Sequence, residues 1–310
     1  MNNIQRMNTL LAGGQVDKVP HCIWYHHKHQ QGKEAVEDHL RFYEESGNAF
    51  IKIINDYNFA LDVKVNQPSD WKAFRPATMN EPYFVQLLDI VRGIVEGGKG
   101  KGLVYLTMFS PFTECSYAVG HDRITADLKT RHQAVLDGLK IVRDNLFRYV
   151  EKYFEAGIDG VFYSCSGGRR GQFTEEEFET YIKPGDLAIL NHANTFKPNN
   201  MLHICSTDVD VTKYKDYPCR VVNWNVHDDG VSLEEGRELF KGKIIFGGMV
   251  GGWHAKGPLS HGTPEEAVNE ARSVIERFGK QGLILGPDCS LPNGTTIDNI
   301  QAVARYLENA

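Results

Sequence analysis

The sequence lacks any long apolar run. None of its 310 residues falls in a stretch of eighteen consecutive apolar residues, which a membrane-spanning helix would need. The start, MNNIQRMNTLLAGG, also has neither the apolar stretch nor the cleavage site of a signal peptide. We therefore expect a cytoplasmic protein with no membrane partner.

Basic residues are not in excess either. Lys and Arg number 34 against 40 Asp and Glu. The formal net charge of −6 therefore gives no sign of the excess of basic residues that nucleic-acid-binding proteins carry. The six cysteines are spread thinly and do not resemble a disulfide framework. In a reducing compartment some of them would be free or bound to metal.

Eight short runs of β-branched or aromatic residues are present. Most are continuously apolar, as expected for parallel strands that are covered on both faces. They are HCIWY (21–25), FIKII (50–54), LVYLTMF (103–109), GVFYS (160–164), MLHIC (201–205), RVVNW (220–224), KIIFGGM (243–249) and GLILG (282–286).

Amphipathic stretches separate these runs. Apolar residues recur every three or four positions from Leu136 to Phe154 and stop before Gly157, which indicates a helix. Thr174 with Glu177, and Thr263 with Glu266, have capping-box spacing. No linker or internal repeat interrupts the alternation.

This alternation favours one domain over residues 1–310, a single (β/α)8 TIM barrel of the α/β class. A doubly wound open sheet is less favoured because no strand is followed by its glycine fingerprint. Residues 63–102 are long for one crossover, and we expect them to form a lid or insertion over the barrel mouth.

His203 and Cys205 form a candidate metal site. Positions two apart on a strand face the same side, and in a barrel the ends of the strands meet at one rim. Cys289, just after the last strand, reaches the same rim, and two cysteines with one histidine can hold a catalytic zinc with one open position. The alternative to a metal site is that one cysteine packs in the core, the histidine has its hydrogen bonds within the protein, and the other cysteine lies on an unrelated loop. Further candidate ligands follow the sixth run: Asn223, Asn225, His227 and Asp228.

Other chemistry-bearing residues follow the remaining strands. Asp56 could act as a general acid or base, or equally cap a turn, and Tyr117 follows the third run together with Glu114. Arg169 and Arg170 could receive a carboxylate or phosphate, although paired arginines are also ordinary on a solvated loop.

The histidines at 26, 27 and 29 do not share one strand face, so the sequence implies no shared metal site there. We interpret them as rim or surface groups, with His27 a candidate for binding substrate.

Several segments together resemble the uroporphyrinogen decarboxylase-like superfamily, whose members are single (β/α)8 barrels. The likeness covers nearly the whole chain. It is carried by FIKIINDYNF, EAGIDGVFYS, FETYIKP, LHICSTDV, YPCRVVNWNVHD, IIFGGMVGG, HGTPEEAV and GLILGPDCSLPNGTTIDNI.

In the decarboxylase branch, the resemblance implies that Asp56 matches a functional aspartate and Tyr117 a functional tyrosine. The arginines of that branch's P-x-W-x-x-R-Q-x-G-R segment are missing. Aligned on Trp24 they become His27 and Gln31, and aligned on Pro20 they become Tyr25 and His29. The branch's late histidine falls at or beside Pro287.

The other branch contains corrinoid-protein-dependent methyltransferases, such as those that methylate coenzyme M. His203, Cys205 and Cys289 match its H-x-C and distant Cys position by position. The similar cobalamin-independent methionine synthases add a glutamate, which this sequence does not show at the end of its sixth run.

The resemblance therefore implies a zinc-dependent methyltransferase. A thiol activated on zinc would receive a methyl group from a corrinoid carried by a separate partner protein, or from another donor. The alternatives are a cofactor-free decarboxylase of uroporphyrinogen or a smaller carboxylated substrate, and a non-catalytic barrel that binds a metal or a partner. A homodimer is a further expectation.

Overall fold

A computed structural model describes residues 1–54, 64–252 and 256–309 of the chain. Its centre is a parallel sheet of seven strands that follow one another in sequence order, so each strand pairs with the next. The strands are β1 Ile51–Ile53, β2 Val104–Phe109, β3 Gly160–Cys165, β4 Met201–Ile204, β5 Val221–Trp224, β6 Ile244–Met249 and β7 Leu283–Pro287.

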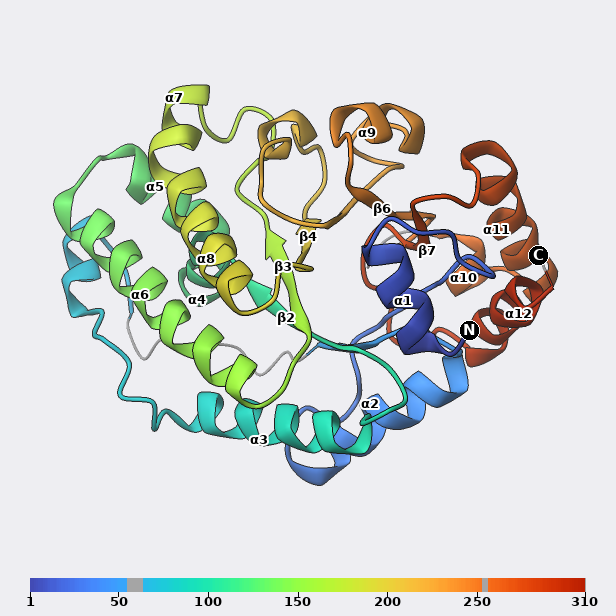
Figure 1. Ribbon diagram of the computed structural model, residues 1–310. Coiled ribbons are helices and arrows are strands. Elements are labelled where there is room, and N and C mark those ends of the chain that lie inside the picture. The colour runs from blue at the N-terminus through green and yellow to red at the C-terminus, as the bar shows by residue number, and fades with distance from the viewer. Residues whose placement is uncertain (55–63, 253–255, 310) are drawn as a thin grey trace.

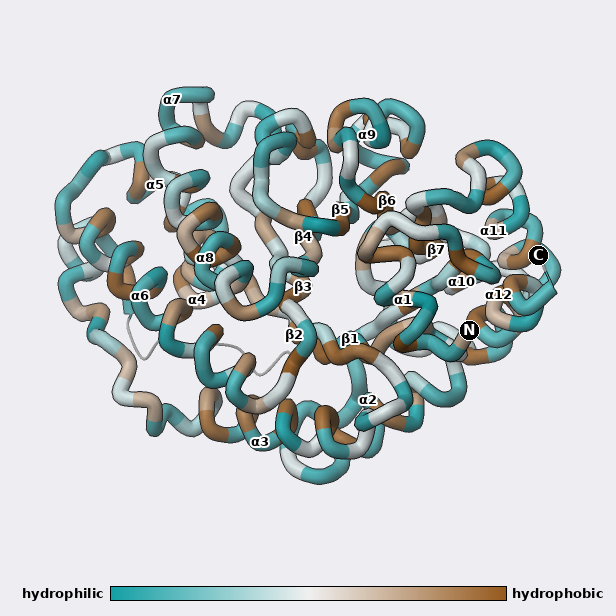
Figure 2. The backbone as a smooth tube through the Cα atoms, viewed as in Figure 1, coloured by the Kyte–Doolittle hydropathy of each residue, from teal (hydrophilic) through white to brown (hydrophobic). Residues whose placement is uncertain are grey.

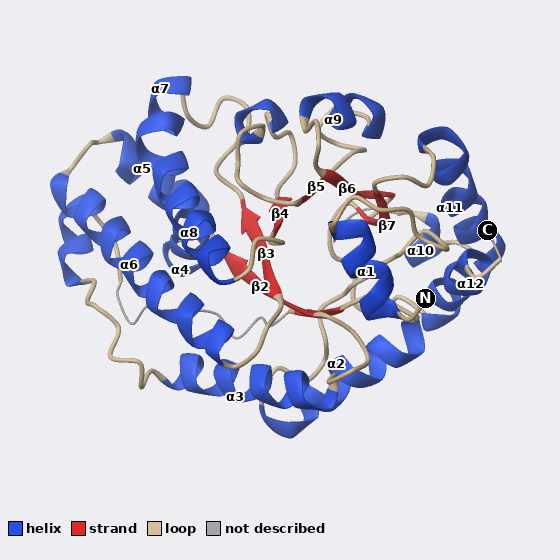
Figure 3. Cartoon of the chain, in the orientation of Figure 1, coloured by secondary structure: helices blue, strands red, loops and turns tan. Residues whose placement is uncertain are grey.

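The sheet is curled, and helices surround it (Figure 1, Figure 3). This is a TIM-barrel-like α/β fold. The larger helices are α1 Asn3–Leu11, α2 Gly32–Ser46, α3 Pro82–Gly97, α4 Pro111–Val119, α5 His121–Lys129, α6 Gln133–Glu155, α8 Lys183–Phe196, α9 Leu233–Leu239, α11 Pro264–Phe278 and α12 Ile297–Leu307. Shorter ones are η1 Pro68–Ala73, α7 Glu175–Glu177, η2 Phe178–Ile182, η3 Val211–Tyr214 and α10 Pro258–His261.

Local sequence signals set several helix boundaries. Both predicted capping boxes are confirmed, since Thr174 and Thr263 each accept a hydrogen bond from the backbone N–H three residues later. The predicted helix before Gly157 is confirmed as α6. Gly157 itself has a φ of 103°, a conformation that glycine adopts without steric cost.

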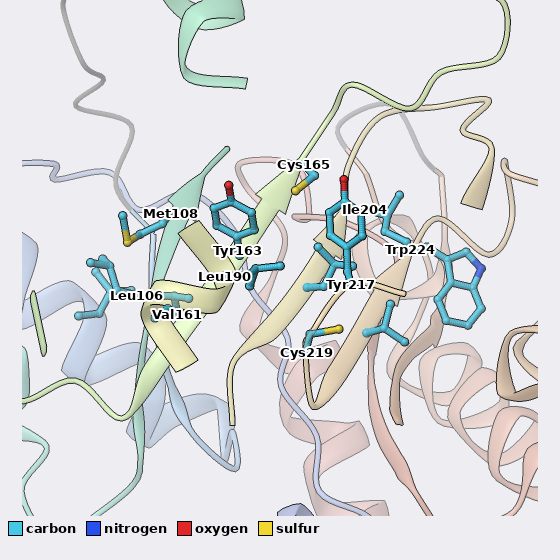
Figure 4. Packing of buried hydrophobic residues seen from close by; sticks show 14 of the residues in the cluster. Leu106, Met108, Val161, Tyr163, Cys165, Leu190, Ile204, Tyr217, Cys219 and Trp224 are labelled. Carbon is cyan, nitrogen blue, oxygen red and sulfur yellow. The ribbon is translucent and has the colours of Figure 1, made fainter. Parts of the chain in front are cut away.

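The strands separate two apolar layers. Side chains alternate along each strand, so Tyr105 and Phe162 point into the barrel while Leu106 and Val161 pack under the helices. Figure 4 shows the outer layer, with Tyr163 and Ile204 of neighbouring strands beside Leu190 of α8. Along the outer helices, hydrophobic and hydrophilic residues alternate (Figure 2).

The strand predicted at 21–25 is not formed as a regular strand. The segment makes isolated parallel bridges from His21 to Leu285 and from Tyr25 to Leu291. On its other side, the backbone N–H and C=O of Ile23 are both bonded by the side chain of Asn48, at 2.9 Å each. The backbone N–H of Ala49 also donates to the carbonyl of His21 at 2.7 Å, so this side is held by one backbone bond and by the side-chain amide of Asn48.

The predicted insertion at 63–102 is largely structured where it is described. Its second half is α3, which packs beside α2 in the outer layer. In its first half, Trp71 is fully buried, stacks on Phe74 and donates to Asp127 at 2.7 Å. A role as a lid stays a prediction.

No helix among the described residues is long and apolar enough to cross a membrane.

Candidate metal centre

Three metal-ligand side chains converge at the carboxyl ends of β4 and β7. His203 lies on β4, Cys205 is the first residue after that strand, and Cys289 comes two residues after β7. One ligand atom from each lies within 4.8 Å of the other two. The Sγ of Cys289 is 3.5 Å from Nε2 of His203. The predicted trio is therefore brought together at one point.

The ring of His203 is oriented by Asn223, its register partner on β5. The Nδ2 group of Asn223 donates to the carbonyls of Phe246 (2.9 Å) and Pro287 (3.1 Å), so its Oδ1 must be the atom that faces His203. That oxygen is 2.5 Å from Nδ1 of His203. Because Nδ1 then carries the proton, Nε2 presents its lone pair toward the cysteines.

The two sulfurs shift each other's pKa in opposite directions. A hydrogen bond from the Cys205 thiol lowers the pKa of Cys289 well below its usual range, and His203 acts in the same direction. The same hydrogen bond raises the pKa of Cys205 well above its usual range, and burial adds to the shift. These shifts favour the thiolate form at Cys289, the form of cysteine that binds metal.

The backbone beside the trio is strained. Ser206, next to Cys205, has a φ of 109°, a value that residues with a side chain rarely adopt. Such outliers persist where the surrounding structure holds them in place.

The geometry fits zinc. A tetrahedral centre with Zn–S of about 2.3 Å and Zn–N of about 2.0 Å places the sulfur and the nitrogen about 3.5 Å apart. The observed separation between Cys289 Sγ and His203 Nε2 is 3.5 Å. A histidine and two cysteines would leave one of the four positions open.

The trio opens into a cavity of about 140 Å³ at the end of the barrel. Its walls combine aromatic rings with polar groups. They are Trp24, His26, Lys52, Ile54, Thr107, Phe109, Tyr117, Phe162, Ser164, His203, Cys205, Cys289 and Ser290. Such a cavity suits a small molecule, because drug-sized ligands occupy pockets of about 300–1,000 Å³.

The two predicted catalytic residues differ in what the structure shows. Tyr117 lines the cavity, is 50% exposed and packs its ring 5.0 Å from that of Phe109. Asp56 lies outside the described residues.

Arg169 and Arg170 lie on the exposed loop after β3. Arg170 donates to the Asp208 carboxylate and to the backbone carbonyl of Asp229, both at 3.0 Å. Neither arginine is among the described residues that line the cavity. In this structure Arg170 ties two loops of the rim together.

The candidate ligands after β5 bond elsewhere. Asn225 is buried and its amide donates to Asp228 in its own turn at 2.7 Å. His227 Nδ1 is 2.6 Å from the fully buried carboxylate of Asp288, which raises the pKa of His227. Among the described residues, neither His227 nor Asp228 belongs to the group of possible metal ligands that His203, Cys205 and Cys289 form, and Asn225 is not in the described cavity wall.

His27 is buried and is not among the described residues that line the cavity. Its ring lies 4.0 Å from that of His39 and 5.6 Å from that of Phe42. Burial lowers the pKa of His27 to about 3, so the ring is neutral near pH 7.

Sequence reasoning missed Lys52, Thr107 and Ser164 in the cavity wall. The signal was available for Lys52. It is a charged residue in the apolar run FIKII, on the same face as Phe50 and Ile54. Asn223 was considered only as a metal ligand, whereas it bonds the ligand histidine.

The curled parallel sheet, with three possible metal ligands beside a small cavity at its carboxyl end, defines the class of this protein as a TIM-barrel-like α/β protein with a candidate metal centre. A sequence model of the family Uroporphyrinogen decarboxylase (URO-D) matches residues 52–309. The chain belongs to that family. A comparison with curated protein sequences finds no match.

Solved structures share the fold. A methyltransferase from Methanosarcina mazei superposes with a TM-score of 0.77 at 16% identity, over 99% of this chain and 98% of that one. A B12-independent methionine synthase from Shewanella sp. W3-18-1 gives 0.53 at 11% identity, over 94% and 96%. A putative vitamin-B12 independent methionine synthase from Listeria monocytogenes gives 0.53 at 12% identity, over 94% and 99%.

Proposed function

We propose that the chain is a zinc-dependent methyltransferase that transfers a methyl group to a small thiol. The observation that carries this proposal is the 3.5 Å separation between Cys289 Sγ and His203 Nε2, beside Cys205 and at the wall of a cavity. The fold shared with a methyltransferase supports the same reaction class.

The residues would divide the work as follows. His203, Cys205 and Cys289 would hold the zinc, and Asn223 would keep Nε2 of His203 deprotonated. Zinc at this point would supply Lewis acidity that keeps a substrate thiol as the thiolate near neutral pH. Tyr117 and the aromatic rings of the cavity would orient the substrate and exclude water.

The segment at 21–25 contributes to the proposed site because it carries part of the cavity wall. We propose that it serves as the eighth strand, which its hydrogen bonds to β7 on one side and to Asn48 and Ala49 on the other support. This position brings Trp24 and His26 to the cavity wall. We therefore take the fold as a closed (β/α)8 barrel.

A corrinoid carried by a separate protein is the methyl donor that we propose, in keeping with the superfamily resemblance. A donor of that size would have to approach from the cavity mouth, where Tyr117 is exposed. Methylcobalamin can stand in for such a protein in a test.

The decarboxylase alternative has less support. The described cavity is small for a tetrapyrrole, and the exposed pair Arg169 and Arg170 lies outside its wall. A smaller carboxylated substrate is tested separately, by adding such a compound to the protein without methylcobalamin and measuring the release of carbon dioxide.

The test is to incubate zinc-loaded protein with methylcobalamin and 2-mercaptoethanol and to detect the methyl thioether by mass spectrometry. Wild type and Cys219→Ser, a buried cysteine outside the cavity wall, should form the product. Cys205→Ser and Cys289→Ser should form at least about 100-fold less, the scale of lost metal-site function. Equal product from Cys289→Ser would refute the proposal.

A further inference from the structure

Ser164 carries a buried hydroxyl group beside the three metal-ligand side chains. It lies on β3 and pairs in register with His203 on β4, and both side chains line the cavity together with Cys205 and Cys289. Only 1% of Ser164 is exposed, and its oxygen has no aligned hydrogen-bond partner among the described residues. Buried hydroxyl groups nearly always have a partner, so the position of this one calls for an explanation.

Cys205 is the group on which this hydroxyl acts. The hydrogen bond to Cys289 and burial raise the pKa of the Cys205 thiol, whereas Ser164 and the backbone N–H of Ser206 lower it. The Ser164 hydroxyl and the Cys205 sulfur are therefore close to each other. A neutral thiol is only a weak acceptor, and the proton of Cys205 is engaged with Cys289.

The other two ligands also have polar neighbours. Asn223 Oδ1 accepts from Nδ1 of His203, and Ser290 Oγ lies 3.9 Å from the Sγ of Cys289. On the β3 side of the cavity, Ser164 is the corresponding neighbour of Cys205. Each ligand of the candidate centre thus has a polar side chain beside it.

A negative charge on Cys205 would complete the missing bond. Cysteine binds metal as the thiolate, and hydrogen bonds to an ionised acceptor are about twice as strong as those between neutral groups. The hydroxyl proton of Ser164 can rotate about its C–O bond toward the sulfur, so β3 need not move. The unpartnered hydroxyl therefore fits the metal-bound form of Cys205.

Such a bond would matter because several sulfurs would compete for one methyl group. In the proposed function, the two cysteine thiolates would lie beside the substrate thiolate in a single cavity. A cysteine that took the methyl group would become a thioether and lose its thiolate charge. A thiolate whose charge is stabilised has a lower pKa, and its nucleophilicity falls with that pKa.

We propose that Ser164 is a positioning residue that donates a hydrogen bond to the Cys205 thiolate of the metal-bound protein and so directs methylation to the substrate sulfur instead of the ligand sulfur. The inference rests on the proposed function for the reaction that is directed. The hydrogen bond itself can be measured without a substrate thiol, so the two can fail separately.

Methyl iodide tests the protection of Cys205 in zinc-loaded protein. The Cys205 sulfur would form a bond to the methyl carbon, the carbon–iodine bond would break, and iodide would leave with its electron pair. Mass spectrometry of the peptide that contains Cys205 measures the rate. We expect Cys205 of Ser164→Ala to be methylated about tenfold faster than that of wild type, the scale of one hydrogen bond to a charged group.

Two variants serve as controls. Ser164→Thr keeps a hydroxyl group and should restore most of the protection. Ser166→Ala removes a hydroxyl two residues further along, which bonds to Thr113 Oγ1 at 2.9 Å, and should behave as wild type. All proteins are compared at equal zinc content, so that loss of metal is not mistaken for loss of protection. Ser164→Gly, which also lacks the hydroxyl, takes the place of Ser164→Ala if that variant does not fold.

Equal rates at Cys205 in wild type and Ser164→Ala would overturn the proposal. The same holds if Cys289 of Ser164→Ala is methylated faster by the same factor as Cys205, because a general opening of the site would then be the cause.

The absorption of cobalt(II)-loaded protein separates this inference from the proposed function. A hydrogen bond stabilises the electrons of a thiolate, so its loss in Ser164→Ala should move the sulfur-to-cobalt absorption to longer wavelength, with no change in Ser166→Ala. If wild type forms no methyl thioether from methylcobalamin, the proposed function fails, and this absorption still decides whether the bond exists. An unshifted absorption in Ser164→Ala would overturn it.

Discussion

Asn223 decides which nitrogen of His203 faces the cysteines. Its amide is fixed by the carbonyls of Phe246 and Pro287, so its oxygen accepts from Nδ1. The sequence shows an asparagine within a strand but not this contact, because its partners come from β4, β6 and β7. Only the assembled barrel makes Asn223 a positioning residue.

We expect Asn223→Ala to weaken zinc binding about 10- to 100-fold, the usual effect of removing a group that orients a ligand histidine. Competition with a fluorescent chelator measures this. Asn225→Ala is the control, because the amide of Asn225 bonds within its own turn. A zinc affinity lowered equally by both variants would contradict the assigned role.

Glu270 of α11 offers a test of pH dependence. Its Oε1 accepts from Val250 N–H at 2.8 Å, whereas its Oε2 is buried and has no hydrogen-bond partner in the described structure. Burial raises the pKa of Glu270 from 4.5 to about 7. Between these values the unfolded chain releases this proton and the folded chain keeps it, so stability falls as pH rises from about 4.5 to about 7.

Glu270→Gln removes the loss of stability that accompanies ionisation of this carboxyl group. We expect the variant to be more stable than wild type at pH 8, by on the order of 2 kcal/mol, and nearly equal to it at pH 4.5. Urea unfolding at the two pH values measures the difference. Glu265→Gln, exposed on the same helix, should show no such pH-dependent gain. A gain of the same size at both pH values would show that the carboxyl is not the cause.

The strands and main helices were predictable because their signals are local. Seven of the eight apolar runs became β1 to β7 within a few residues of the expected bounds. The exception, 21–25, has a strand-like composition, but on one side it is held by a single backbone bond from Ala49 and by the side chain of Asn48. Pattern alone does not reveal that a side chain supplies part of this pairing.

Asn48→Ala tests how much the bonds from the Asn48 side chain to Ile23 contribute to stability. The change leaves the buried N–H and C=O of Ile23 without their bonds, so we expect a loss of about 2–4 kcal/mol in the free energy of unfolding. Urea denaturation measures it, with the exposed Asn309→Ala as control. A loss below about 0.5 kcal/mol, the range of surface changes, would mean that this bridge does not hold the segment.

For the whole molecule, the barrel brings together residues that are far apart in sequence. His203 and Cys289 are 86 residues apart, yet their ligand atoms are 3.5 Å apart because β4 and β7 end at the same rim. The trio was predictable from the barrel rule and the family resemblance. Lys52 and Thr107 were not, because their meeting depends on the register between β1 and β2.

The central claim is that this rim holds one catalytic zinc. The most direct measurement is the zinc content per chain, by mass spectrometry of the metal, in protein purified without added metal. We predict about one zinc in wild type and in Cys219→Ser, and far less in Cys289→Ser. A folded wild type without metal, or a Cys289→Ser variant with its full zinc content, would contradict the account.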